Sequence, residues 1–323
     1  MDGGKFIISL DFELLWGELD LPEKESYKAK VIGGRKAIPN ILNLFDKYGI
    51  HATWATVGIV GCKGKKQLMD NIPYKIPSYM NKKCSAYEHL SEIGENEQDD
   101  PCSFAPSIIE TIKSYNGQEI GTHTFSHYYC NEDGADVESF RADIKKAIEM
   151  MRDDYGITVK SLVFPRNQAK DEFVRVAIEE GILCWRGSPA GYIISSCRLM
   201  DLFNRVLRIA DTYLPIFGSL CTDIEDANND GCCMASRFLR PYNSKLAFLE
   251  GMKLRRIKNQ MEFAAKKKKV FHLWWHPHNF GDNADIMLDQ LEELLKYYEK
   301  LNKKYAYESI NMKEFVALRS GKL

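Results

Sequence analysis

Two carboxylates stand close together near the start of the chain, in the segment ISLDFELLW. Asp11 and Glu13 are two positions apart, so on a strand their side chains share one face while Phe12 points to the other. Carboxylates this close discourage each other's ionisation unless a cation lies beside them. The pair therefore indicates a functional site, with a strand end that turns into solvent as the alternative.

Two histidines in the segment GTHTFSHYYC have the spacing of metal ligands. His123 and His127 form an HxxxH pair, and on one side of a helical turn both imidazoles would reach one ion at about 2.0–2.1 Å. With a carboxylate from another strand end they make a two-histidine, one-carboxylate set with open positions, suited to zinc, iron or a related divalent ion. The alternative is a pair of structural histidines in an aromatic-rich turn.

A histidine and an arginine follow two further apolar runs. His276 ends VFHLWWH and precedes Pro277, which holds its backbone extended, and a histidine there can donate a proton near neutral pH. Arg166 follows SLVFP, where a guanidinium beside a carboxylate site would keep an aspartate ionised through paired hydrogen bonds. The alternative for Arg166 is a surface arginine that begins the next loop. Arg186 and Arg240 are weaker candidates for the same role.

These residues follow strand-like runs, so the elements that carry them decide whether they meet. Apolar, β-branched and aromatic runs alternate with segments of helical period, which predicts parallel strands with crossover helices. The expected strands are 5–13, 51–58, 119–125, 161–165, 182–187, 236–242, 270–276 and 306–310. The expected helices are 36–47, 137–151, 171–180, 199–213, 245–264 and 286–301. Seven or eight such units favour a barrel over an open sheet, and the C-terminal strand ends of a β/α barrel meet at one mouth.

Two stretches interrupt the alternation. Residues 62–104 contain prolines among polar residues, and residues 190–233 contain an acidic loop. We interpret both as insertions over the mouth of the barrel. No internal repeat or low-complexity linker divides the chain, so we predict a single domain over residues 1–323.

Composition narrows the range of functions. The 323 residues are 45% hydrophobic and 28% charged with a formal net charge of −1, which is typical of a globular protein and gives no general attraction to nucleic acid. No apolar run approaches the length of a transmembrane span, and the N-terminus lacks the pattern of a signal peptide. The nine cysteines form no CxxC pair and are expected as free thiols. We expect a cytoplasmic protein, and the oligomeric state stays open.

The order of these motifs resembles the polysaccharide deacetylase family, the NodB-homology group of carbohydrate esterases. The resemblance implies a distorted seven-stranded β/α barrel, a base aspartate and a metal-binding carboxylate on the first strand, an H(S/T)xxH metal motif, an arginine and proline motif, and a late general-acid histidine. The matching positions here are Asp11 and Glu13, His123 and His127, Pro165 and Arg166, and His276. The family's first motif has two adjacent aspartates, whereas Phe12 separates the two carboxylates here, which leaves the division of their roles open.

We combine the residues and the resemblance into one expectation: a metal-dependent hydrolase that removes an acetyl group from an N-acetylated or O-acetylated sugar or polysaccharide precursor. Glu13, His123 and His127 are the expected ligands of a divalent metal, zinc first, with cobalt, nickel or iron as alternatives. Asp11 is the expected base and His276 the expected acid, with Arg166 keeping Asp11 anionic. A hydrolase of another non-peptide C–N bond and a non-catalytic sugar-binding protein with a structural metal remain as alternatives.

Overall fold

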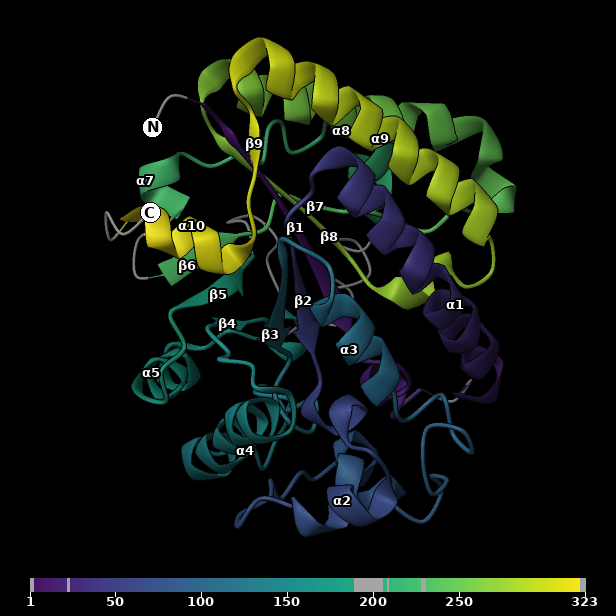
Figure 1. Cartoon of the computed structure of the whole chain (residues 1–323), viewed down its shortest axis with the longest axis vertical. Coiled ribbons are helices and arrows are strands. Elements are labelled where there is room, and N and C mark those ends of the chain that lie inside the picture. Colours follow the sequence, from purple (N-terminus) through teal and green to yellow (C-terminus); the bar gives the residue numbers. More distant parts are fainter. Residues whose placement is uncertain (1–2, 22–23, 189–205, 208, 228–230, 320–323) are drawn as a thin grey trace.

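The strands of the protein form one parallel sheet (Figure 1). The computed structural model describes residues 3–21, 24–188, 206–207, 209–227 and 231–319. The sheet order is β6-β5-β4-β3-β2-β1-β8-β7, and β9 pairs with the start of β1. The strands are β1 (Lys5–Phe12), β2 (Ala52–Thr56), β3 (Gln118–Thr122), β4 (Ser161–Leu162), β5 (Cys184–Gly187), β6 (Cys232–Met234), β7 (Arg237–Phe238), β8 (Val270–Trp275) and β9 (Glu308–Ser309).

One extended segment closes this sheet into a barrel. β6 pairs with β5 at one edge and β7 pairs with β8 at the other, yet only Ala235 and Ser236 separate β6 from β7. Ala235 N donates to Gly187 O at 2.9 Å and Ser236 N donates to His272 O at 2.8 Å, so the segment bridges both edges. Counted as one strand, β6 and β7 complete a ring with β1 to β5 and β8. The predicted distorted barrel of about seven parallel strands is confirmed.

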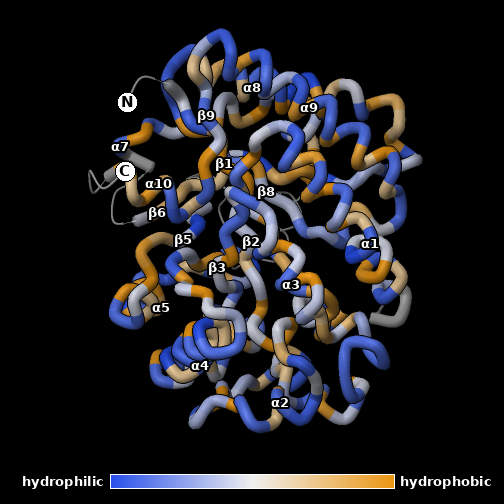
Figure 2. The backbone as a smooth tube through the Cα atoms, viewed as in Figure 1, coloured by the Kyte–Doolittle hydropathy of each residue, from blue (hydrophilic) through white to orange (hydrophobic). Residues whose placement is uncertain are grey.

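Helices surround the barrel in Figure 1. α1, α8 and α9 lie together on one side, and α4 packs against α5 on another. Figure 2 shows that these helices mix hydrophobic and hydrophilic residues along their length, as expected for elements with one buried face. None of the described helices is both long and apolar enough to cross a membrane. The helices are α1 (Lys24–Tyr48), α2 (Lys65–Asp70), α3 (Pro106–Lys113), α4 (Val137–Tyr155), α5 (Asp171–Glu179), α7 (Ile224–Ala227), α8 (Glu250–Lys267), α9 (Ala284–Tyr305) and α10 (Met312–Arg319).

The inner face of β1 is apolar near the base of the barrel and polar at the mouth. Every residue of β1 is buried, which fits a strand covered on both faces. Along β1, Ile8, Leu10 and Phe12 pack into the large outer core beneath the helices, while Ile7 belongs to a small inner cluster with Met312 and Phe315 of α10. By alternation Ser9 and Asp11 follow Ile7 on the inner face, toward the C-terminal end of the strand. The interior therefore ends in buried polar side chains at the mouth.

Helix α1 begins at Lys24, twelve positions before the start expected from the sequence. Gly33 and Gly34 lie inside this helix, where they serve its packing. A Cβ on Gly33 would lie 2.2 Å from Gly281 O, and one on Gly34 would lie 2.4 Å from His278 Cα. The missing side chains therefore let α1 approach the turn that follows His276, and so help to position that histidine.

The two predicted insertions differ in how much of them is described. Residues 62–104 are described throughout; they contain α2 and short 3-10 turns, and Figure 1 shows α2 at the end of the molecule beyond α4. The second insertion, 190–233, and the expected helix 199–213 lie partly outside the described residues. The described part of that stretch includes α7 and the start of the closing segment.

Candidate metal and acid–base site

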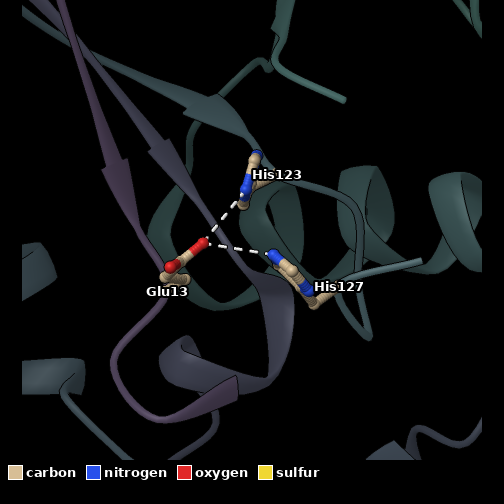
Figure 3. A group of neighbouring side chains, drawn as sticks. All are labelled: Glu13, His123 and His127. Atoms are coloured by element: carbon tan, nitrogen blue, oxygen red, sulfur yellow. Dashed lines mark hydrogen bonds and ion pairs between the residues drawn. The ribbon is translucent and has the colours of Figure 1, made fainter. Parts of the chain in front are cut away.

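The three predicted metal ligands meet at the barrel mouth (Figure 3). Glu13 Oε2 lies 3.1 Å from His127 Nε2 and 3.3 Å from His123 Nε2, and the three side chains are buried. Their candidate ligand atoms all lie within 4.8 Å of one another. Glu13 directly follows β1 and His123 directly follows β3, so the parallel sheet brings together residues that are 110 positions apart.

The imidazole of His123 is oriented for ligation. Its Nδ1 lies 2.7 Å from the carbonyl oxygen of Val163, so Nδ1 carries the proton and Nε2 turns its lone pair toward Glu13. His127 Nδ1 is buried and has no hydrogen-bond partner among the described residues. A backbone acceptor that sets the tautomer of one histidine is a common support for metal-binding imidazoles.

The HxxxH segment is not the helical turn that the spacing suggested. It is a loop in which Thr124 and His127 have left-handed backbones, with φ of 65° and 58°. Asp143 of α4 holds this loop: Phe125 N donates to Oδ1 at 2.6 Å and Ser126 N donates to Oδ2 at 3.2 Å. The loop conformation thus depends on a side chain from outside the motif.

Asp143 is a residue that the sequence analysis missed. It is buried on the face of α4 that also carries Phe140, Ile144 and Ala147. A charged residue on the apolar face of a predicted helix was the available signal, because a buried carboxylate needs hydrogen-bond partners. Burial raises the pKa of Asp143 to about 6 despite the hydrogen bonds that it accepts from the loop.

Glu13 occupies a site in which burial and positive partners oppose each other. Burial alone would raise its pKa, but the neighbouring imidazoles of His276, His123 and His127 hold the pKa well below its ordinary value. The carboxylate also needs the space left by Gly17, since a Cβ there would lie 2.2 Å from Glu13 Cδ. Burial likewise lowers the pKa of His127, which favours the neutral imidazole that a metal requires.

Asp11 is held by an arginine, but not by the one predicted. Arg186 of β5 is fully buried, and its Nη1 and Nη2 donate to Asp11 Oδ1 and Oδ2 at 2.6 and 2.7 Å. Asn167 Oδ1 accepts from Nε and Nη2 of the same guanidinium at 3.1 and 3.0 Å. Burial alone would raise the pKa of Asp11, but Arg186, with smaller effects of His123 and His276, holds it below its ordinary value.

The predicted pairing of Arg166 with Asp11 is wrong. Arg166 Nη2 instead donates to Asp20 Oδ1 at 2.6 Å, and its guanidinium lies 4.4 Å from the ring centroid of Tyr129. The reason is local: Arg166 and Asn167 are both left-handed, with φ of 53° and 55°. In this turn Asn167 accepts a hydrogen bond from Arg186, the partner of Asp11. Arg166 lies at the partly exposed edge of the site.

The sequence did contain a signal for Arg186. It lies within the apolar run ILCWRG, in a predicted strand, and a guanidinium buried in a strand must find an anionic partner. The Arg186 guanidinium also packs over the ring of Trp274, 4.2 Å from the indole centroid. The position inside a strand, rather than after one, distinguishes Arg186 from Arg166.

His276 lies beside both carboxylates. Its Nε2 is 3.6 Å from Asp11 Oδ2 and 3.6 Å from Glu13 Oε1. Its ring is stacked on that of His278, with centroids 4.7 Å apart and planes 15° from parallel. His276 Nδ1 is buried without a partner among the described residues. The histidine predicted as the acid is therefore brought to the site, together with its neighbour in the turn.

A second group of potential ligands shares one member with the first. Glu13, Glu18 and His278 also have candidate ligand atoms within 4.8 Å of one another. His278 Nε2, however, already lies 2.8 Å from the hydroxyl of Tyr27. The first group fits a metal better, because His123 and His127 both turn Nε2 toward the same oxygen of Glu13.

A cavity of about 500 Å³ opens on the His278 side of the site. Tyr27 and His278, whose side chains are hydrogen-bonded to each other, both line it. The other lining residues include aromatic, amide and charged side chains: Tyr213, Tyr242, Asn243, Asn279, Lys30, Arg240 and Asp282. Such a mixture of aromatic surface and hydrogen-bonding groups is suited to a polar ring compound.

Comparison with known proteins agrees with this geometry. The polysaccharide deacetylase family model matches residues 32–185, a stretch that includes His123 and His127 but begins after Asp11 and Glu13 and ends before Arg186 and His276. The search of curated proteins finds no match.

Solved structures share the fold at low sequence identity. A protein from Mycobacterium smegmatis that is classed as a polysaccharide deacetylase is 13% identical with a TM-score of 0.59, over 100% of this chain and 93% of that chain. One so classed from Pseudomonas aeruginosa PAO1 is 11% identical with a TM-score of 0.54, over 99% and 91%. The 4-alpha-glucanotransferase of Thermococcus litoralis is 12% identical with a TM-score of 0.55, over 98% of this chain and 40% of that chain.

Fold and site together define a parallel β/α barrel with a two-histidine, one-glutamate group at its mouth. The family match over residues 32–185 confirms the predicted resemblance to the polysaccharide deacetylase family, and the solved structures confirm the fold. The likeness to the glucanotransferase shows that this fold alone does not specify a reaction.

Proposed function

We propose that the protein is a metal-dependent hydrolase that removes an acetyl group from an N-acetylated or O-acetylated sugar. One observation carries the proposal: a candidate metal group, a carboxylate held anionic by an arginine, and a histidine lie together at the barrel mouth. A binding protein has no need of the second and third of these. The combination is the one that acyl transfer to water requires.

Glu13, His123 and His127 are the residues that fit a divalent metal, with zinc as our first expectation. The donor set of two imidazoles and one carboxylate suits zinc, and also cobalt, nickel or iron. A metal held there supplies Lewis acidity toward the acyl carbonyl and the attacking water. The tautomer of His123, set by Val163 O, is the feature of this chain that prepares the set.

Asp11 is suited to take a proton from the attacking water. It is buried and both of its oxygens accept hydrogen bonds from Arg186, so the carboxylate is anionic and fixed in orientation. Because each Asp11 oxygen has a further lone pair, the hydrogen bonds to Arg186 leave room for a proton. In this proposal Asp11 serves as the base and Glu13 as the ligand.

His276 is suited to protonate the departing amine or alkoxide. Its Nε2 lies 3.6 Å from an oxygen of each carboxylate, and its ring stacks on that of His278, which lines the cavity. An amine is a poor leaving group without a proton, so an amide substrate depends on this step more than an activated ester does.

The test combines metal analysis with acetate release from N-acetylated and O-acetylated sugars. We expect about one divalent ion per chain and acetate release that a chelator abolishes. Asp11→Asn and His276→Ala should each lower the rate by about 10²- to 10⁴-fold while metal content is retained. Glu119→Gln, which changes another buried carboxylate at the far end of the barrel, is the matched control.

Two outcomes would contradict the proposal. Metal binding without acetate release from any of these sugars would indicate a binding protein with a structural metal. Acetate release at the normal rate by His276→Ala would remove this histidine from the reaction.

A further inference from the structure

Arg166 and Asp20 form an ion pair at the edge of the site. Arg166 Nη2 donates to Asp20 Oδ1 at 2.6 Å, and the two side chains are 37% and 16% exposed. A guanidinium has five N–H donors, and among the described residues Asp20 is the hydrogen-bond partner of Arg166. The pair therefore offers further donors on Arg166 and acceptor capacity on Asp20 to a molecule that enters the mouth.

This pair adjoins the candidate metal group. The guanidinium of Arg166 lies over the ring of Tyr129, 4.4 Å from its centroid. The same ring packs edge-on against His127, with centroids 4.9 Å apart and planes at 85°. Arg166 is thus one aromatic ring away from a metal ligand, on the side of His127, whereas the cavity lies on the side of His278.

Both members of the pair belong to segments that contact residues of the site. Arg166 belongs to the left-handed turn whose next residue, Asn167, binds the Arg186 guanidinium. Asp20 follows the short 3-10 helix Trp16–Glu18, whose Gly17 touches the Glu13 carboxylate. Both members are therefore anchored to the groups that perform the proposed chemistry, and cation–π packing on Tyr129 restricts Arg166 further.

We propose that Arg166 and Asp20 together bind hydroxyl groups of the sugar that carries the acetyl group. A hydroxyl both donates and accepts, so neighbouring hydroxyls of a sugar ring match a guanidinium and a carboxylate placed side by side. The charges of the pair cancel, which favours a neutral sugar over an anionic one. This inference rests on the proposed function, because it assigns the substrate-binding part of the same site.

A purely structural role is the competing explanation. The ion pair also connects the loop after β1 with the turn after β4, and a partly exposed pair of this kind adds little stability. If the ion pair were purely structural, breaking it would alter thermal stability or metal content. A substrate-binding pair would alter KM and the sugar affinity instead.

The first experiment compares Arg166→Gln and Asp20→Asn with Arg141→Gln, which breaks the ion pairs of Arg141 with Glu179 and Glu180 on the outer helices. The probe is a neutral N-acetylated chitooligosaccharide. We expect KM to rise about 10- to 100-fold in the two site variants, as for the loss of hydrogen bonds to charged groups, with kcat and metal content nearly unchanged. Arg141→Gln should leave KM unaltered.

The second experiment measures affinity without turnover, by calorimetry of the same oligosaccharide with the Asp11→Asn protein. Adding Arg166→Gln should weaken binding by the factor seen in KM. Adding Asp20→Asn should make the site net positive and shift its preference toward an acetylated oligosaccharide that carries a uronic acid.

These results separate the inference from the proposed function. If the wild-type protein releases no acetate but Arg166→Gln weakens oligosaccharide binding, the proposed reaction fails and the binding pair stands. If Arg166→Gln and Asp20→Asn leave both KM and the calorimetric affinity unchanged, or lower only thermal stability and metal content, the pair is a strut and the inference is overturned.

Discussion

Two buried glutamates at opposite ends of the barrel show different solutions to the same problem. At the mouth, Glu13 faces the Nε2 atoms of His123 and His127, and its pKa is held well below the ordinary value against the effect of burial. At the base, Glu119 accepts from Thr53 Oγ1 at 2.7 Å, and burial raises its pKa. Glu119 thus has neutral hydroxyl and amide donors, whereas Glu13 has partners that are themselves metal ligands.

The comparison teaches that burial of a carboxylate does not identify a site, while the type of its partners does. Hydroxyl and amide donors satisfy the hydrogen-bonding capacity of Glu119, so no ligand is needed there.

Backbone strain is divided between the two ends of the barrel in the same way. Of the seven non-glycine residues with positive φ in the described part of the chain, two are helix C-caps, and the other five lie in loops at the mouth: Leu14, Thr124, His127, Arg166 and Asn167. Strain concentrated where polar side chains converge is typical of a functional site.

The largest effect is expected for Arg186, the buried arginine at the barrel mouth. Arg186→Met leaves Asp11 buried without its partner and should lower the free energy of unfolding by about 3–5 kcal/mol. Arg166→Met, which breaks a partly exposed pair, should cost no more than about 1 kcal/mol. Urea unfolding of both variants checks this, and equal losses would remove the distinction between the two arginines. Arg186→Met combined with Asp11→Leu should recover most of the loss, because no unpaired charge remains.

The two glutamates themselves give the next test. Glu13→Gln should weaken zinc binding by roughly 100-fold or more, since loss of a supporting neighbour alone costs about 10- to 100-fold. Glu119→Gln should leave zinc affinity unchanged and lower the free energy of unfolding by about 1–3 kcal/mol, because one of its buried hydrogen bonds is lost. Competition with a chromogenic chelator and urea unfolding measure the two quantities. Zinc loss in Glu119→Gln would refute the contrast.

Asp143 tests whether the mouth depends on support from the outer helices. Asp143→Ala removes the acceptor for Phe125 N and Ser126 N, so the loop between the two histidines should loosen and metal affinity should fall about 10- to 100-fold. Asp153→Ala, at an exposed position of the same helix, is the control. Unchanged metal affinity in Asp143→Ala would show that the loop keeps its conformation unaided.

The smallest effect is expected at the base, where His51 Nδ1 lies 2.8 Å from Glu314. This hydrogen bond raises the pKa of His51 in the folded protein. The stabilisation should therefore be full below the unfolded value near 6.5 and disappear as the pH rises through the folded value. Since the ring is half-exposed, we expect less than about 1 kcal/mol. Wild type and His51→Gln should differ in unfolding free energy at pH 5.5 and converge at pH 8.5, and a gap that widens with pH would contradict this.

The sequence by itself determined the features that depend on local period. Alternation along a buried strand put Asp11 and Glu13 on one face, and the position of polar residues after apolar runs placed His123, His127 and His276 at one mouth. These inferences held because strand period and parallel topology leave few choices.

Only the tertiary structure decided which arginine serves Asp11 and what holds the histidine loop. The sequence places Arg186 inside a predicted strand and Arg166 after one, but their partners depend on the left-handed turn at Arg166 and Asn167. Asp143 lies 16 positions beyond His127, on α4. It reaches the loop through packing that no local pattern encodes. Long-range contacts select among locally permitted conformations, and for that reason the partners of the site residues were set by the folded barrel.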